Sequence, residues 1–384
     1  MKIGLVCPYN IAKGGGVQEI VRAMQQELTK RGHTAKILTP EPRDIEAHHR
    51  QDDIIFVGSA ADFKSPLHTT SQFSVTADTY GIDQMLEEED FDILHFHEPW
   101  VPMLSRQILS RSKCINIATF HAKLPETMMS RTVVRVVTPY TKAVLRHLDE
   151  LTAVSEAAAE YVCSLTDDPV TIIPNGIDLS VYKSVKHETE PQEAPKMLLY
   201  IGRLERRKGV ACLLEAYRLL EERDENVELV IAGDGPDRGK LENYAEEIGI
   251  TNITFTGYVT EEEKLELLGR ADLFCAPALY GESFGIVLLE AMACGLVTVA
   301  GNNPGYASVL QELGSLSLVN PKDSEEFARR LDVMLHDENL RKLWRKWAKD
   351  YVKQFSYTRI VDQYLEVYET AHKRYAPLLD VIDE

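Results

Sequence analysis

The chain has 384 residues, of which 44% are hydrophobic, and its formal net charge is −18 at pH 7. This length suggests two or three domains with an ample apolar core. The acidic balance argues against general nucleic-acid binding, which needs a basic surface, and against membrane binding through overall charge. No apolar run is long enough to cross a bilayer, and six scattered cysteines without a C-x-x-C pair indicate reduced thiols in a cytosolic protein.

The N-terminal half alternates between predicted strands and helices. A strand at 2–7, too short for a secretory signal, is followed by glycines at 14–16 and by a helix that ends at Gly32. That helix is predicted from apolar residues at helical spacing, at positions 17, 20, 21, 24 and 28. Further strands are expected at 33–38, 53–57, 93–96, 115–119 and 151–154. This alternation predicts a parallel sheet covered by helices on both faces.

The second half begins after a polar, proline-containing stretch at 187–195, which we interpret as an interdomain linker. Strand and helix then alternate again. We expect strands at 197–201, 227–232, 253–255 and 273–276, and helices from Val210 and over 261–268. Apolar residues at 360, 361, 364 and 367 predict a last helix within 356–375. The sequence therefore predicts two α/β halves.

Two carboxylates, Glu282 and Glu290, are separated by seven residues within 281–295. A helix starting near Phe284 would place Glu282 just before its N-terminus, where free N–H groups and the helix dipole bind anions or sugar hydroxyls. Glu290 would point from the helix to the same side and bind a ribose diol. Two Glu on one helix are often only solvated, so the flanking Gly-Glu-Ser-Phe-Gly and Glu-Ala-Met-Ala-Cys-Gly make the pattern specific.

This pattern resembles the E-x7-E signature of the retaining glycosyltransferases of family 4, which have a GT-B fold. Nearly the whole chain shares the resemblance, through Cys-Pro-Tyr and Gly-Gly-Val-Gln near the N-terminus, Phe-Asp-Ile-Leu-His-Phe-His-Glu-Pro at 91–99 and Ile-Pro-Asn-Gly-Ile-Asp at 173–178. It implies a hexosyltransferase with two Rossmann-like, doubly wound parallel-sheet domains facing a central cleft. The implied domains are an acceptor-binding domain at 1–186, joined by a C-terminal helix at about 358–384 that packs back on it, and a nucleotide-sugar-binding domain at 187–357.

A basic stretch at 202–209 follows the first strand of the second half and contains Arg203 and Lys208. Charge runs are usually solvated loops, but open α/β sheets bind ligands at this end of their strands. The resemblance implies that Arg203 and Lys208 neutralise the leaving diphosphate, so no metal is expected. The D-x-D at 90–92 runs into a buried strand and makes a poor metal site.

The glycines at 14–16 either form a tight turn or let the backbone approach a diphosphate, and the resemblance favours the second interpretation. His95 and His97 alternate on a strand and are either structural or metal ligands that lack a third partner. The resemblance implies catalytic roles for His121, Arg203, Lys208 and Glu282. It implies nucleotide-sugar binding by Gly15, Gly16, Val259, Glu261, Lys264, Ser283, Phe284, Gly285, Ile286 and Glu290, and acceptor binding by Tyr9, Gln18, Trp100, Lys123 and Arg207.

Within the family, the whole chain resembles the phosphatidylinositol mannosyltransferases. This implies GDP-mannose as the nucleotide-sugar donor and a lipid-linked or polyol acceptor such as a phosphatidylinositol-like glycolipid. Glu261 suits the N–H donors of guanine. The acceptor half departs from the group at Trp100, at Ala122 and in the acidic stretch 83–90, where the group has a basic amphipathic helix. A UDP-glucose or UDP-N-acetylglucosamine transferase with a soluble acceptor, a non-catalytic nucleotide-sugar-binding protein and a sugar-phosphate epimerase are the alternatives.

Residues 127–148 contain no Asp or Glu, and Arg131, Arg135, Lys142 and Arg146 alternate with Met, Val and Leu. Such a segment either lies in an anionic membrane interface or forms an ordinary helix on the first sheet. We therefore expect a cytoplasmic protein, peripheral on the cytoplasmic face of the membrane if this segment docks.

Overall fold

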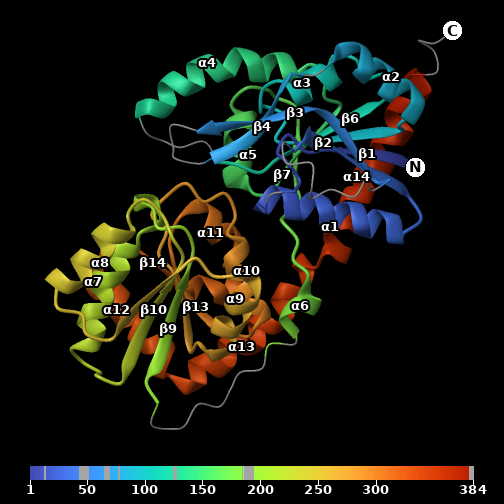
Figure 1. Cartoon of the computed structure of the whole chain (residues 1–384). Helices are drawn as coiled ribbons and strands as arrows, with labels where there is room; N and C mark the ends of the chain where they lie inside the picture. Colours follow the sequence, from blue (N-terminus) through green and yellow to red (C-terminus); the bar gives the residue numbers. More distant parts are fainter. Residues whose placement is uncertain are drawn as a thin grey trace. The chain divides into compact units, whose positions relative to one another are not determined.

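A computed structural model of the chain describes residues 1–12, 14–42, 52–64, 70–76, 78–123, 128–183, 185 and 194–379. Contacts divide the chain into two compact units. The first comprises Met1–Gly176 and Tyr357–Glu384, and the second comprises Ile177–Ser356. Each unit is built on a sheet of its own, with helices packed against it (Figure 1).

The first unit contains an eight-stranded sheet in the order β4-β3-β2-β1-β5-β6-β7-β8. Every neighbouring pair is parallel except β3 and β4, which are antiparallel. The order reverses between β1 and β5, so connections leave these two strands in opposite directions. The strands are β1 (Lys2–Val6), β2 (Thr34–Glu41), β3 (Ile54–Lys64), β4 (Thr70–Thr76), β5 (Ile93–His97), β6 (Ile115–Phe120), β7 (Glu150–Ala153) and β8 (Val170–Ile172).

The helices of the first unit include the long C-terminal helix. Helix α14 packs on α1 and β6, and Arg31 at the end of α1 pairs with Asp362 and donates to the carbonyl of Thr358 at 2.6 Å. The hydroxyl of Tyr368 lies 2.6 Å from Nδ1 of His95 on β5. The last helix therefore belongs to the first unit. The helices are α1 (Gly16–Lys30), α2 (Thr79–Glu89), α3 (Leu104–Leu109), α4 (Met128–Leu145), α5 (Glu156–Cys163) and α14 (Tyr357–Leu379).

The second unit contains a fully parallel six-stranded sheet in the order β11-β10-β9-β12-β13-β14. The order reverses between β9 and β12, which lie side by side. Together the two sheets confirm the predicted pair of doubly wound α/β halves. The strands are β9 (Lys196–Ile201), β10 (Val227–Ala232), β11 (Ile253–Gly257), β12 (Leu273–Ala276), β13 (Val297–Gly301) and β14 (Leu318–Val319).

Helices cover both faces of the second sheet, with α7, α8 and α12 on one side and α9, α10 and α13 on the other (Figure 1). The helices are α6 (Leu179–Lys183), α7 (Val210–Glu221), α8 (Arg238–Glu247), α9 (Glu261–Arg270), α10 (Ile286–Ala293), α11 (Pro304–Val309), α12 (Ser324–His336) and α13 (Glu338–Tyr351). Short 3-10 helices are η2 (Arg206–Lys208), η3 (Glu312–Ser317) and η4 (Val352–Phe355). Within the described residues, no helix is both long and apolar enough to span a bilayer.

The chain enters the second unit after Gly176, before the polar stretch at 187–195, most of which lies outside the described residues. Two contacts explain this earlier boundary. The N–H of Ile177 donates to the carbonyl of Phe355 at 2.8 Å, and the hydroxyl of Tyr182 in α6 donates to Glu290 at 2.9 Å. The segment that carries α6 is therefore held by the second sheet's helices, although its sequence precedes the polar stretch.

Candidate active site

The loops that follow β9 and β12 meet in the second unit. The N–H of Leu279, after β12, donates to the carbonyl of Arg207, after β9, at 2.8 Å. Gly209 has φ 70°, and a Cβ there would lie 2.1 Å from the carbonyl oxygen of Pro277, so only glycine permits this approach. Ligands of open α/β sheets bind outside the carboxyl ends of the strands, where the strand order reverses. These two loops therefore form the candidate site of this unit.

One carboxylate from the second loop joins the cations of the first. Oε1 of Glu282 lies 2.7 Å from Nη1 of Arg207 and 2.8 Å from Nζ of Lys208. Glu205 bridges Arg203 and Arg207: one of its oxygens lies 2.8 Å from Nε of Arg203 and the other lies 3.0 Å from Nε of Arg207. We call Arg203, Glu205, Arg207, Lys208 and Glu282 the Glu282 cluster. Residues far apart in the sequence thus form one charged group.

The Glu282 cluster contains three cations and two carboxylates, and its carboxylates are more shielded from water than its arginines, which are 42% (Arg203) and 31% (Arg207) exposed. The side chain of Glu282 is only 11% exposed and that of Lys208 is 20% exposed. Burial by itself lowers the pKa of Arg207, but the charges of Glu282 and Glu205 raise it above its ordinary value. The surplus positive charge of this partly shielded cluster favours a bound anion such as a diphosphate.

The loop that carries Glu282 rests on the first turn of α11. The side-chain oxygen of Asn303 caps this helix by accepting from the N–H of Tyr306 at 3.0 Å. A Cβ on Gly305 would lie 2.2 Å from the backbone oxygen of Glu282, and one on Gly285 would lie 2.6 Å from the ring of Tyr306. Two glycines therefore allow the close packing that positions Glu282.

Helix α10 begins at Ile286, two residues later than the predicted start near Phe284. Gly285, with φ 110°, is the N-cap residue, and no side chain caps the helix. The side chain of Phe284 is 3% exposed and packs edge-on against Phe355 with ring centroids 6.0 Å apart. Phe284 could therefore contact a ligand only through its backbone. Ser283 and Ile286 flank this turn and are half-buried.

The second predicted carboxylate, Glu290, lies within α10 and has two partners. Its Oε1 accepts from the hydroxyl of Tyr182 at 2.9 Å and from Nζ of Lys264 at 3.0 Å. Lys264 also pairs with Glu261 at 2.7 Å, and the carboxylate of Glu261 is 78% exposed at the start of α9. Val259 precedes this helix and is half-buried. The structure thus brings the predicted residues Val259, Glu261, Lys264 and Glu290 into one neighbourhood.

The first unit holds the other predicted residues near the ends of β1, β5 and β6. Trp100 follows β5 and stacks obliquely on Tyr161, with ring centroids 5.5 Å apart. Lys123 follows β6, and its buried Nζ lies 3.1 Å from Glu160. Gly15 is the N-cap residue of α1, and Gly16 and Gln18 lie in its first turn. Tyr9 follows β1, and His121 follows β6. A Cβ on Gly15 would lie 2.5 Å from the side-chain oxygen of Gln18.

The histidines of the first unit form a buried group rather than an isolated residue. Nδ1 of His97 lies 2.9 Å from Nε2 of His121, and Nε2 of His95 lies 2.6 Å from the hydroxyl of Thr119. Burial lowers the pKa of His95 to about 3 and that of His121 to about 4, so these rings are neutral near pH 7. Among the described residues, no group of three or more His, Cys, Asp or Glu side chains is placed to hold a metal ion.

Glu98 lies directly after His97 and was not predicted to matter. Its backbone is left-handed, with φ 52°, and its Oε1 accepts from the N–H of His121 at 2.6 Å. Burial raises the pKa of this carboxyl to about 8. The residue sits in the His-Glu-Pro stretch that the sequence analysis used only as a family signature. A carboxyl group on a strained backbone, which holds the N–H of His121, is a positioning feature of this site.

Two other members of the site were missed from sequence. Glu205 lies inside the basic stretch at 202–209 and was treated as part of a charge run, although it bridges two arginines. Tyr182 lies before the polar stretch and was assigned to the first domain. The basic segment 127–148 falls partly outside the described residues and side chains; in the rest of it, Lys142 and Arg146 are exposed while Val144 and Leu145 are buried.

Family models match both halves of the chain. The model described as Glycosyltransferase Family 4 matches residues 14–181, and the model described as Glycosyl transferases group 1 matches residues 183–351. A phosphatidyl-myo-inositol mannosyltransferase of Mycolicibacterium smegmatis is 31% identical over 373 residues, covering 96% of this chain and 94% of the relative. The enzyme of the same name from Mycobacterium tuberculosis strain H37Rv is 30% identical, and the match covers 96% of this chain and 97% of the relative.

Solved structures share the fold along the whole length. A glycosyltransferase from Rickettsia africae superposes with a TM-score of 0.76 at 18% identity and covers 96% of this chain and 98% of its own. HepE from Anabaena, solved in complex with UDP and glucose, superposes with a TM-score of 0.74 at 18% identity and covers 96% and 99%. At this identity the likeness concerns the fold alone, and it confirms the predicted GT-B class.

Proposed function

Because the chain belongs to the glycosyltransferases that join a family 4 domain to a group 1 domain, we propose that it is a retaining mannosyltransferase. Its donor would be GDP-mannose and its acceptor a phosphatidylinositol-like lipid or another polyol. Relatives at 30–31% identity over 96% of the chain carry the name phosphatidyl-myo-inositol mannosyltransferase. The observation that carries the proposal is the chain of ion pairs that joins Arg203 and Lys208 to Glu282, for Arg203 by way of Glu205 and Arg207.

The Glu282 cluster suits the reacting end of the donor. Phosphate oxygens would replace Glu282 as partners of Lys208 and compete with Glu205 for Arg203, because charge-assisted hydrogen bonds to phosphate are strong. The carboxylate of Glu282 and the backbone N–H groups at the start of α10 would then bind sugar hydroxyls. Arg207 contacts the same carboxylate and would orient it beside the acceptor.

The Glu290 cluster, which comprises Tyr182, Glu261, Lys264 and Glu290, suits the nucleoside end. Glu290 lies inside α10, on the helix that Glu282 precedes, and would accept from the ribose hydroxyls. Its partners Tyr182 and Lys264 fix its position. The exposed carboxylate of Glu261 would accept from the N1–H and N2–H groups of guanine.

In the reaction, the acceptor oxygen would attack the anomeric carbon on the face from which the phosphate leaves. The bond between that carbon and the phosphate oxygen breaks, and its electron pair stays on the phosphate. That oxygen then takes the acceptor's proton, so no side chain is required as a base. Arg203 and Lys208 would stabilise the developing negative charge, the role that a metal plays in other transferases. Neutral, buried His121 would support the positive charge at the anomeric centre.

The acceptor half carries features of its own. The acidic helix α2 is partly neutralised inside the unit, because Glu89 pairs with Lys2 at 3.0 Å and with Lys36 at 2.7 Å, and Asp83 pairs with Arg111 at 3.1 Å. This helix therefore offers no basic docking face. We propose that Lys142 and Arg146, both exposed near the end of α4, contribute to contact with an anionic membrane.

Donor and acceptor can be tested together with purified protein and phosphatidylinositol vesicles. We expect mannosylated lipid from GDP-mannose, detected by mass spectrometry, and a larger rise in melting temperature with GDP than with UDP. Turnover of UDP-glucose or UDP-N-acetylglucosamine, with a larger UDP shift, would overturn the mannosyl assignment. If the protein fails to float with anionic vesicles at low salt, the proposed acceptor is a soluble polyol and not a lipid. Binding of donor without hydrolysis or transfer would favour a non-catalytic protein.

A further inference from the structure

A pocket of about 740 Å³ opens in the second unit, at the edge of the sheet opposite to the candidate active site. Lys196 is the first residue of β9, Asp272 precedes β12 and Gly295 leads into β13, so the pocket lies at the amino ends of these strands. The active-site loops follow the carboxyl ends of β9 and β12. The pocket therefore lies at the opposite end of these strands from the loops that carry the Glu282 cluster.

The pocket is basic in an acidic protein. Seven of its nineteen lining residues are Lys or Arg and two are Asp or Glu, whereas the whole chain has a net charge of −18. Four of the cations recur at every fourth residue along α13 and η4: Arg341, Arg345, Lys349 and Lys353. Residues four apart lie on one face of a helix, and like charges at this spacing repel each other. The arrangement is unfavourable unless negative charge compensates it.

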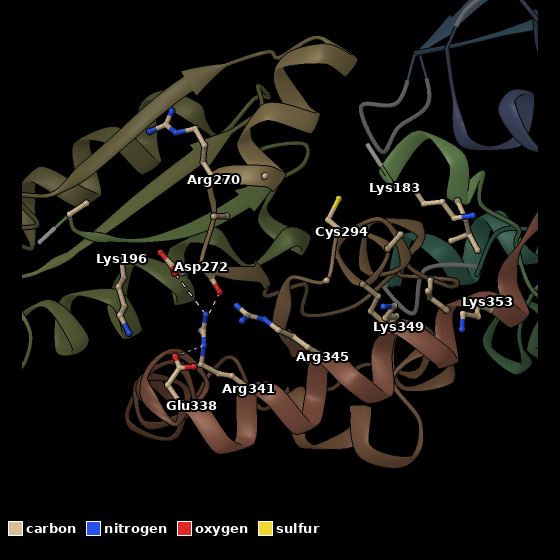
Figure 2. Close-up of a pocket in the computed structure, with 18 of the residues that line it drawn as sticks. Lys183, Lys196, Arg270, Asp272, Cys294, Glu338, Arg341, Arg345, Lys349 and Lys353 are labelled. Atoms are coloured by element: carbon tan, nitrogen blue, oxygen red, sulfur yellow. Dashed lines mark hydrogen bonds and ion pairs between the residues drawn. The ribbon is translucent and has the colours of Figure 1, made fainter. Parts of the chain in front are cut away.

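Carboxylates of the described chain compensate only part of this row. Arg341 is 3% exposed, pairs with Glu338 at 3.4 Å and donates to the carbonyls of Asp272 and Met334 at 3.3 and 3.0 Å. Lys353 pairs with Asp350 at 2.6 Å. Figure 2 shows the guanidinium groups of Arg341 and Arg345 side by side below Asp272. Burial and the charge of Arg345 lower the pKa of Arg341, while the charges of Asp272 and Glu338 raise it in part.

Nε of both Arg341 and Arg345 is buried without a hydrogen-bond partner in the described chain, but Arg341 has Glu338 as an ion-pair partner. Within the same part of the chain, no carboxylate forms an ion pair with Arg345 or Lys349. A buried guanidinium nitrogen without a partner costs free energy, because it has lost its hydration.

Helix ends explain some of the positive charge but not this residue. Helices α9 and α10 both end at the pocket, and the partial negative charge of helix C-termini attracts cations. However, Nε of Arg345 does not donate to a helix-end carbonyl, because it has no hydrogen-bond partner among the described residues. Lys196, for its part, donates to the carbonyl of Leu335 at 3.2 Å. Within the described residues, neither a carboxylate nor a carbonyl therefore satisfies Nε of Arg345.

We propose that this pocket is a second anion site, which binds a phosphate-bearing ligand through Arg345 and Lys349. The volume lies within the range of small-molecule pockets, roughly 300–1,000 Å³. Arginine presents a planar fork that matches phosphate oxygens, and lysine adds a point charge. The phosphate belongs either to a soluble ester or to the headgroup of an anionic lipid, and both sources present the same chemistry.

Inorganic pyrophosphate is the probe for a soluble source. Pyrophosphate can also bind to the cations of the candidate active site. The calorimetric titrations are therefore made with an R203Q/K208Q variant, in which two of those cations are removed. We expect binding there, and a loss of affinity of about tenfold or more when R345Q and K349Q are added. The control pair K342Q/K346Q removes the same charge from exposed positions of α13 that do not line the pocket, and it should leave the affinity unchanged.

Vesicles of phosphatidylcholine with phosphatidylglycerol test the lipid source by flotation of the wild-type chain. Flotation that R345Q/K349Q abolishes and K342Q/K346Q preserves would support the site with a lipid headgroup as its ligand. The proposal would be overturned if the two pairs weakened binding equally in the assay where binding is seen. It would also be overturned if the chain bound neither pyrophosphate nor vesicles. Circular dichroism of each variant verifies that the fold is retained.

Discussion

The ammonium group of Lys208 lies 2.8 Å from Oε1 of Glu282, although the two residues follow different strands. Without a ligand, this contact balances a cation that we assign to the donor diphosphate. In the proposed reaction, the same contact would also keep Glu282 in place for the sugar. One ion pair thereby links the two functions that the family resemblance assigned to separate motifs.

Replacing Lys208 by Gln should lower kcat/KM by about 10²- to 10³-fold, the usual cost of removing one group that stabilises developing charge. The loss should appear mainly in kcat, since the negative charge grows in the transition state. Steady-state kinetics at varied donor concentration measure both kcat and kcat/KM. Lys240→Gln is the matched control, because that side chain is 81% exposed on α8. Near-normal kcat in K208Q would show that the stretch 202–209 is only a solvated loop.

Glu290→Gln should raise the donor KM about tenfold while changing kcat less, because the ribose lies away from the bond that breaks. Tyr182→Phe removes the hydroxyl that donates to the same carboxylate and keeps the charge. We expect it to have a smaller effect in the same direction. A kcat defect in E290Q with an unchanged donor KM would contradict the ribose assignment.

The alternation of strands and helices sufficed to predict two α/β halves, and β10 and β12 match their predicted bounds. The strands β4, β8, β13 and β14 were not predicted, and β8 and β14 have only three and two residues, which carry no periodic signal. Likewise, Arg203, Lys208, Glu282 and Glu290 were found through motifs. Their partners Glu205 and Tyr182 were not, because a hydrogen bond between distant segments leaves no pattern in one sequence.

Gly305→Ala tests how α11 positions Glu282. The new Cβ would lie 2.2 Å from the backbone oxygen of Glu282, so the loop must shift. We expect a loss of about 1–3 kcal/mol of stability and a marked loss of transfer activity. Gly239→Ala on α8 is the control, because its Cβ meets nothing within 4 Å and should stabilise the helix by about 0.5–1 kcal/mol. Equal activity of the two variants would refute the positioning role of α11.

Glu98→Gln should change how stability depends on pH. Burial raises the pKa of Glu98 to about 8 in the folded chain, against about 4.3 for an unperturbed Glu. Protonated Glu98 therefore contributes stability that is complete below about pH 4.3 and is lost as the pH rises through about 8. Gln cannot ionise, so the melting temperature of E98Q relative to wild type should rise between pH 5 and pH 8.

Thermal unfolding by circular dichroism across that range provides the comparison. Glu87→Gln removes an exposed carboxylate of α2 in the same unit and serves as the control. The difference in melting temperature between E87Q and the wild type should stay nearly constant with pH. A difference for E98Q that falls with pH would mean that Glu98 is stabilised in its ionised form, through the N–H of His121.

The anomeric configuration of the product tests the central claim most directly. GDP-α-mannose labelled with 13C at the anomeric carbon is incubated with the chain and acceptor, and the one-bond C–H coupling of the purified product is measured by NMR. Retaining transfer by the Glu282 cluster, with the leaving phosphate as base, predicts an α-mannoside. A β-mannoside would contradict the mechanism, because inversion requires a general base on the opposite face of the sugar.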